Sequence, residues 1–183
     1  MIDLLTLHKQ FIEPHIFKGA VAADFTMGNG HDTLWLCQKV GENGRVYAFD
    51  IQDQALNNTR ALLSQELPYE NYTLIHDSHA NALEHIHEPI NVGMFNLGYL
   101  PGGDKSVTTL RPSTLAAVEA AISLLAPDSI LLVAVYPGHA EGEAEGEMLR
   151  EYFSGLSRFR YCAGIFKLVN SPTSPFFYII ETK

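Results

Sequence analysis

The 183-residue chain is poor in cysteine, in cations and in long apolar runs, and each shortage excludes a class of protein. Its two cysteines, Cys37 and Cys162, are too few for a disulfide framework, and their apolar surroundings predict reduced, buried thiols in a cytoplasmic protein. The longest apolar run, Ile130 to Val135, is far too short to cross a bilayer, and the first residues lack the order of a signal peptide. We therefore expect no membrane association.

Cations are also scarce: 12 Lys and Arg stand against 21 Asp and Glu, which gives a net charge of −9. This charge argues against a strong, non-specific grip on polyphosphate. It still permits a nucleic-acid substrate that is bound with modest affinity or on a surface completed by a partner subunit.

What the chain does have is the composition of a globular enzyme, with 46% hydrophobic and 18% charged residues. Its length predicts a single domain over residues 1–183. Apolar runs alternate with helical patterns, which is typical of an α/β fold with a mostly parallel sheet and helices on both faces. The predicted strands lie near 20–25, 45–50, 72–76, 91–96, 129–136, 160–168 and 175–182. The predicted helices lie near 31–40, 52–66, 79–87, 112–126 and 141–157.

Three details complete this architecture. The first 18 residues are expected to form a helix or helix–turn outside the sheet. Pro112 starts and Pro127 stops the helix near 112–126. The last two strands are joined by a link too short for a helix, so they should form a hairpin that leaves an antiparallel strand at the end of the sheet.

The segment from Ala20 to Thr33 carries the strongest chemical signal. An apolar run ends in Asp24, Gly28 and Gly30 follow, and a helical pattern starts at once. This strand–loop–helix lets the backbone approach a ligand closely beside a helix N-terminus. A second apolar run ends in Asp50, where a carboxylate can accept hydrogen bonds from ribose hydroxyls. The pair predicts an adenosine-containing cofactor.

Two features favour S-adenosylmethionine over a nicotinamide dinucleotide. Thr33 stands where the dinucleotide fingerprint requires its third glycine. Asp24 would repel a diphosphate but attract the α-ammonium group of S-adenosylmethionine. A nicotinamide-dependent oxidoreductase is therefore a less favoured alternative, and a plain tight turn without a ligand is the other.

Polar side chains end the later strands as well, where ligands of parallel sheets bind. Asp77 and Ser78 could accept from an adenine amino group or cap the helix that follows, and the two roles are compatible. The glycine-rich segment from Asn96 to Lys105 pairs an amide with Tyr99. The Asn96 oxygen and the carbonyls near Leu97 could orient an amine that accepts a methyl group, while Tyr99 stacks on a base. Alternatively, this segment is a loop in which Tyr99 only packs.

Two further groups have simpler explanations. Among histidines 76, 79, 85 and 87, the pair His76 and His79 could share a helix face, whereas His85 and His87 could not face each other. No cysteine accompanies them and no carboxylate is at ligand spacing, so no metal is expected, and helix capping or solvent exposure is favoured. The acidic run from Glu141 to Glu147 suits a solvated helix start, although contact with a cationic substrate stays open.

Four motifs resemble those of a small bacterial methyltransferase family, catalogued as rRNA methylases and associated with modification of the tRNA wobble uridine. They are the loop from Asp24 to Thr33, the run from Asp77 to Asn81, the run from Asn96 to Lys105, and Tyr136 to His139. The resemblance covers nearly the whole chain. It implies a class I, Rossmann-like fold with seven strands, S-adenosylmethionine as cofactor, and often a homodimer.

The resemblance also implies a reaction, methylation of the 5-aminomethyl group of wobble (2-thio)uridine to 5-methylaminomethyl, with the tRNA anticodon loop as partner. A small-molecule or rRNA methyltransferase using the same site is the alternative. Taken together, the motifs suggest residues for three roles. The predicted acceptor-orienting residues are Asn96, Leu97 and Tyr99. The predicted cofactor residues are Asp24, Met27, Gly28, Asn29, Gly30, Asp32, Thr33, Asp50, Gln52, Asp77, Ser78 and His79. The predicted substrate residues are His31, Asp104, Lys105, Tyr136 and His139. The family usually has alanine at Phe25, so this ring is expected to add bulk beside the methionine end.

Overall fold

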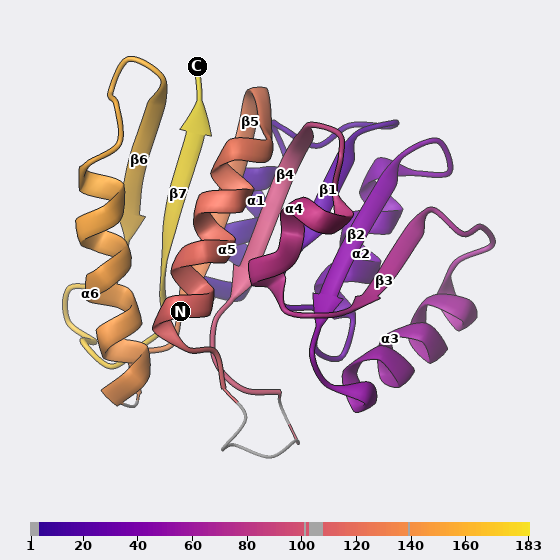
Figure 1. Cartoon of the computed structure of the whole chain (residues 1–183), viewed down its shortest axis with the longest axis horizontal. Coiled ribbons are helices and arrows are strands. Elements are labelled where there is room, and N and C mark those ends of the chain that lie inside the picture. Colours follow the sequence, from indigo (N-terminus) through magenta and orange to yellow (C-terminus); the bar gives the residue numbers. More distant parts are fainter. Residues whose placement is uncertain (1–3, 101, 103–107, 139) are drawn as a thin grey trace.

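A computed structural model, which describes residues 4–100, 102, 108–138 and 140–183, shows one seven-stranded sheet with helices on both faces (Figure 1). The strands are β1 (Val21–Asp24), β2 (Arg45–Asp50), β3 (Tyr72–His76), β4 (Ile90–Asn96), β5 (Leu125–Val135), β6 (Tyr161–Phe166) and β7 (Phe176–Thr182). The helices are α1 (Leu4–Ile12), α2 (His31–Val40), α3 (Asp53–Glu66), the 3-10 turn η1 (His79–Asn81), α4 (Ala82–His85), α5 (Arg111–Leu124) and α6 (Ala140–Ser154).

The strand order is β3-β2-β1-β4-β5-β7-β6, and β7 runs antiparallel to both of its neighbours. The expected hairpin of the last two strands is therefore confirmed, with β7 inserted between β5 and β6. The predicted α/β architecture, seven strands with a reversed last strand, is confirmed as well.

Alternating side chains of the strands build a separate core on each face of the sheet, as the two-residue period of a strand requires. One core combines sheet residues such as Phe95 and Val133 with α4, α5 and α6. The other combines Met94 and Leu132 with α1, α2 and α3. The amino-terminal helix α1 thus lies outside the sheet, as expected, and packs on the second face.

Two predicted boundaries differ in the structure. The expected helix over 79–87 is only η1 and one turn of α4, after which Ile86 is extended and buried. The helix expected to stop at Pro127 ends at Leu124, and β5 begins at Leu125. The register between β4 and β5 shifts just here, so the strand accommodates a residue that has no N–H to donate.

The two thiols have different surroundings. Cys37 is buried in the second core, but Cys162 is exposed on the edge strand β6, so the expectation of burial is wrong for Cys162. β6 is the last strand of the sheet and, among the described strands, pairs with β7 alone, which leaves Cys162 open to solvent. Each helix in the described part of the chain is too short or too polar to cross a membrane.

Candidate functional site

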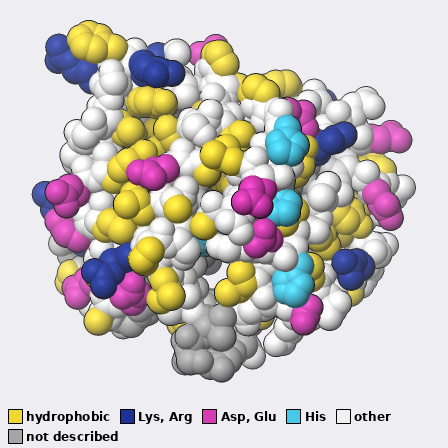
Figure 2. Space-filling view, viewed as in Figure 1, with side chains coloured by type: hydrophobic (Ala, Val, Ile, Leu, Met, Phe, Trp, Pro, Cys, Tyr) yellow, Lys and Arg dark blue, Asp and Glu magenta, His cyan; other side chains and the backbone are white. Residues whose placement is uncertain are grey.

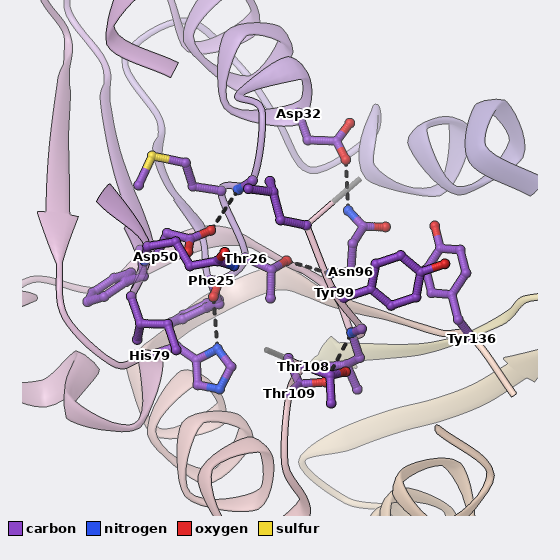
Figure 3. Close-up of a pocket in the computed structure, with 18 of the residues that line it drawn as sticks. Phe25, Thr26, Asp32, Asp50, His79, Asn96, Tyr99, Thr108, Thr109 and Tyr136 are labelled. Carbon is purple, nitrogen blue, oxygen red and sulfur yellow. Dashed lines mark hydrogen bonds between the residues drawn. The ribbon is translucent and has the colours of Figure 1, made fainter. Parts of the chain in front are cut away.

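The order in which strands are added to the sheet reverses between the parallel neighbours β1 and β4, and a cleft opens at the carboxyl ends of these strands. After β1 the sheet grows through β2 to β3, whereas β4 starts the other half. Open α/β sheets bind ligands at such a reversal. The cleft has a volume of about 1210 Å³, large enough for a nucleoside cofactor together with a second ligand (Figure 3).

The cleft collects most of the residues proposed from the sequence. Those that line it are His31, Asp32, Met27, Gly28, Asn29, Asp50, Gln52, Asp77, Ser78, His79, Asn96, Leu97, Tyr99 and Tyr136. Three others, Asp24, Gly30 and Thr33, lie behind its wall. Asp104, Lys105 and His139 lie outside the described residues.

The two glycines after β1 do different things. Gly28 has a φ of 53°, a left-handed conformation that suits glycine, and its N–H donates to the Asp50 carboxylate over 3.0 Å. Gly30 also has positive φ, and a Cβ there would come within 2.7 Å of the Thr59 hydroxyl. Gly28 therefore presents backbone to the cleft, while Gly30 lets the start of α2 pack against α3.

Asp24 is fully buried at the end of β1. One of its carboxylate oxygens accepts from the Thr33 hydroxyl at 2.7 Å, and the other accepts from the Thr26 N–H at 3.1 Å. The carboxylate thereby joins the loop to α2. Burial and, to a smaller extent, the nearby Asp32 carboxylate raise the pKa of Asp24 to about 7, although the hydrogen bond from Thr33 acts in the opposite direction.

This raised pKa predicts a pH-dependent stability. Because the pKa of Asp24 is about 7 in the folded protein and 3.8 for an unperturbed aspartate, the folded state holds this proton more tightly. The stability that protonated Asp24 contributes to the folded state is complete below about pH 4 and is lost as the pH rises through about 7. We expect the free energy of unfolding, measured by urea titration between pH 4.5 and 7.5, to fall more steeply for the wild type than for Asp24→Asn. The exposed control Asp53→Asn should keep the wild-type slope, and equal slopes for all three proteins would refute this role.

Asp50 ends β2 with its carboxylate at the cleft. One oxygen accepts from the Gly28 N–H and the other from the Gln52 N–H, each over 3.0 Å. Two backbone donors thus fix the carboxylate, and each oxygen keeps a further lone pair for a ligand. A carboxylate held in this way is suited to accept hydrogen bonds from vicinal hydroxyls.

The segment after β3 both caps a turn and lines the cleft. The Ser78 hydroxyl accepts from the Ala80 N–H at 3.2 Å, which confirms the predicted cap. Asp77 accepts from His85 over 2.8 Å, and this bond together with the Ser78 N–H lowers the pKa of Asp77. His79 bonds to the Phe25 carbonyl over 2.9 Å, and burial lowers its pKa, which favours a neutral ring (Figure 3).

Asn96 lies at the carboxyl end of β4, in the middle of the cleft (Figure 3). Its backbone N–H donates to the Thr26 hydroxyl over 2.6 Å. Its side-chain N–H donates to Asp32 over 2.8 Å. The side-chain oxygen of Asn96 is buried and has no hydrogen-bond partner in the described part of the chain. A buried acceptor left open in a cleft is suited to bind a ligand that donates a hydrogen.

A short antiparallel bridge between Tyr99 and Thr108 closes the loop that follows Asn96. Below it, the Gly98 N–H donates to the Thr109 hydroxyl, and this hydroxyl donates to Glu145 over 3.0 Å. Tyr99 stays 41% exposed, so its ring is accessible from the cleft.

Glu145 is the anchor of this loop and is buried, although the acidic run around it was expected to be solvated. Its two oxygens accept from Thr109 and from Thr114 of α5. The expectation failed for Glu145 because helical periodicity turns it toward α5, where it meets the buried Thr114. We expect Glu145→Ala to lower the free energy of unfolding by about 2–4 kcal/mol, since it leaves two hydroxyl donors without their acceptor and creates a cavity.

A chemical denaturation curve measures this loss. The exposed Glu147→Ala should change stability by less than about 0.5 kcal/mol, because its ion pair with Arg150 lies on the surface. Equal effects of the two substitutions would contradict the anchoring role.

The sequence matches a known protein family and a curated relative. The sequence profile of a family described as "Putative rRNA methylase" matches residues 46–181. The chain belongs to this family. The tRNA (mnm(5)s(2)U34)-methyltransferase, chloroplastic, of Arabidopsis thaliana is 39% identical over an alignment 173 residues long, which covers 89% of this chain and 63% of that protein. The chain thus spans less than two thirds of the length of that relative.

Solved structures agree with the family assignment. A family protein from Clostridium thermocellum is 35% identical and superimposes with a TM-score of 0.96, covering 100% of this chain and 99% of that one. A methyltransferase from Streptococcus mutans in complex with SAH is 34% identical, with a TM-score of 0.90 and the same coverage. The strand order and these superpositions identify the class I methyltransferase fold, as the family resemblance implied.

Sequence reasoning missed several cleft residues. His8 and Lys9 of α1 line the cleft, and so do Thr108, Thr109 and Thr173. The sequence places α1 outside the sheet but does not say which end of the sheet it reaches. The contact between Lys9 and Asp32, at 2.7 Å, shows that α1 contributes to the site.

Phe25 lines the cleft, and most of its ring is packed in the core. Its ring is 1% exposed and stacks between Phe49 and Phe95, with centroid separations of 5.8 and 4.4 Å. The extra bulk relative to alanine thus fills the core beneath the cleft. The described residues contain no group of three metal-ligating side chains, and His76 and His85 are engaged by Ile51 and Asp77.

Proposed function

We propose that this protein is an S-adenosylmethionine-dependent methyltransferase that converts the 5-aminomethyl group of tRNA wobble (2-thio)uridine to 5-methylaminomethyl. The observation that carries the proposal is the open, buried amide oxygen of Asn96 at the carboxyl end of β4. Family membership, a relative that is a tRNA (mnm(5)s(2)U34)-methyltransferase and an SAH complex of a structural relative support it. We also propose that residues 1–183 act as one catalytic domain.

The residues of the cleft fit the donor. Asp50 would accept the ribose hydroxyls, and Gln52, Asp77, Ser78 and His79 would surround the adenine. A dinucleotide fits less well, because Lys9 is the one Lys or Arg among the described lining residues, and it is paired with Asp32. When bound, S-adenosylmethionine supplies a methyl group on a positively charged sulfonium, which is already a good leaving group. The supporting residues Asp24, Gly30 and Thr33 would hold the loop that carries Met27, Gly28 and Asn29.

The acceptor half of the cleft would orient an amine. The Asn96 oxygen accepts one N–H, and a carbonyl near Leu97 accepts the other, so that the lone pair faces the methyl donor. Tyr99 and Tyr136 line the same cleft, and they would stack on the flanking faces of an unpaired base (Figure 3). A wobble base in an anticodon loop can be presented in this way without melting a helix. His31, Asp104, Lys105 and His139 belong to the same proposed substrate side.

The surface charge bears on how RNA would bind. On the described part of the face shown in Figure 2, acidic and basic side chains are interspersed, with a group of cations beside β6 and the C-terminus. Together with the net charge of −9, this distribution predicts modest affinity for tRNA. We propose a homodimer, in which a second subunit would complete the RNA surface, and a cytoplasmic location.

Two alternatives use the same donor site. The acidic charge favours a small-molecule acceptor, and the family description favours rRNA. Mass spectrometry of nucleosides from tRNA and rRNA of a deletion strain separates them. The proposal expects the aminomethyl nucleoside to accumulate in tRNA and its methylated form to disappear. An unchanged tRNA profile, with or without a lost rRNA methyl group, would remove the tRNA assignment.

A further inference from the structure

Three charged or polar side chains from separate elements form a continuous chain beside the cleft. Lys9 of α1 pairs with one oxygen of Asp32 at 2.7 Å. The other oxygen of Asp32, at the start of α2, accepts the side-chain N–H of Asn96 at 2.8 Å. The side chains of Lys9 and Asp32 are 28% and 21% exposed, so both groups are substantially shielded from water.

This chain determines which way the Asn96 amide faces. An ionised carboxylate can only accept hydrogen bonds, so the amide must turn its NH2 group toward Asp32. Its oxygen then faces away from Asp32, buried and without a partner in the described part of the chain. If the amide were flipped, its NH2 group would lie where the oxygen now lies. Its oxygen would then face the Asp32 carboxylate oxygen, and the two would repel each other.

Lys9 offsets the negative charge that gathers around Asp32. Asp24 lies close enough to Asp32 for the two carboxylates to interact, and their repulsion opposes two charges in this region. The Lys9 ammonium offsets this repulsion, and it lies over the Trp35 ring at 5.3 Å from the centroid, which fixes its position. The amino-terminal helix thereby contributes to the orientation of a group on β4.

We propose that Lys9 and Asp32 are positioning residues that hold the Asn96 oxygen toward the cleft, so that the site selects acceptors with an N–H to donate. The inference rests on the proposed function and deepens it, because it defines the acceptor as an amine. A flipped amide would donate to the acceptor and compete for its lone pair.

The test measures the amide directly and does not depend on activity. In 15N-labelled protein, the Asn96 side-chain NH2 signals are assigned with Asn96→Asp, and their exchange with water is measured. We expect slow exchange in the wild type and exchange faster by roughly tenfold or more in Lys9→Met and Asp32→Asn, since the charge-assisted bond is weakened or lost. Lys9→Arg should retain slow exchange.

Lys39→Met is the matched control. Lys39 lies over the same Trp35 ring at 5.5 Å, but it pairs with Glu13 and does not line the cleft. Its removal should leave the Asn96 signals unchanged.

Kinetics and binding give the second readout. We expect kcat for methyl transfer to tRNA to fall roughly 10- to 100-fold in Lys9→Met and Asp32→Asn, as for other groups that orient a functional side chain. KM for tRNA and the Kd for SAH should stay within about twofold, and Lys9→Arg should recover most of kcat.

Each outcome decides a different claim. Unchanged exchange in both Lys9→Met and Asp32→Asn would overturn the positioning role, and so would a large loss of SAH affinity. If the wild type transfers no methyl group to tRNA, the proposed function fails while the exchange measurement still decides the positioning claim.

Discussion

Replacing Asn96 with alanine is expected to lower kcat for methyl transfer by about 100- to 1000-fold, the usual effect of removing one preorganised polar group from a reacting centre. The substitution removes a buried amide oxygen that has no partner among the described residues, so an acceptor amine would no longer be oriented. The donor half of the cleft would remain, because Asp50 and the residues after β3 are untouched. Single-turnover kinetics with tRNA and calorimetry with SAH measure the two properties separately.

The exposed Asn57→Ala on α3 is the control and should behave as wild type. A variant of Asn96 that loses SAH affinity in parallel with kcat would move this residue to the donor side. A variant with normal kcat would remove it from the reaction altogether.

The second large effect is expected at Asp50. Asp50→Ala should raise the Kd for SAH by roughly 10- to 100-fold, because one or two charged hydrogen bonds at about 1.5–3 kcal/mol each are lost. Part of this loss comes from the loop, since the Gly28 and Gln52 N–H groups lose their acceptor. Isothermal titration calorimetry gives the affinity, and thermal unfolding shows that the variant is folded.

Asp53→Ala provides a matched control three residues later, with a carboxylate that is 87% exposed and outside the cleft. It should leave the Kd for SAH within about twofold. Wild-type affinity in Asp50→Ala would contradict the ribose role and would leave the donor site without its main acceptor.

Much of this architecture could be predicted because periodicity and strand ends are local properties of the sequence. Short apolar runs located all seven strands, and the short link before Pro175 identified the hairpin. Polar residues at strand ends marked the cleft, because parallel strands bring their carboxyl ends to one edge. These inferences need no knowledge of how distant segments meet.

The incorrect predictions depend on tertiary structure, because they concern which distant residue a side chain contacts. Asp24 faces Thr33 and lies behind the cleft wall, although its place before the glycines suggested direct contact with a ligand. Glu145 is turned inward from an acidic run, and Cys162 is exposed because its strand is at the edge. Lys9 reaches the site only because α1 packs on the sheet against β5.

The raised pKa of Asp24 also affects how negative charge is distributed in the site. Its pKa of about 7 means that near neutral pH this residue is only partly ionised, so Asp50 and Asp77 supply more of the negative charge on the donor side. A cationic methyl donor would thus meet carboxylates that are fixed by backbone N–H groups.

The most direct measurement combines the purified protein, methyl-labelled S-adenosylmethionine and tRNA isolated from the deletion strain. After digestion to nucleosides, we expect label in the 5-methylaminomethyl derivative of the wobble uridine, with matching loss of the aminomethyl precursor. Label on a ribose hydroxyl or a ring atom, or no transfer to tRNA at all, would contradict the proposed function.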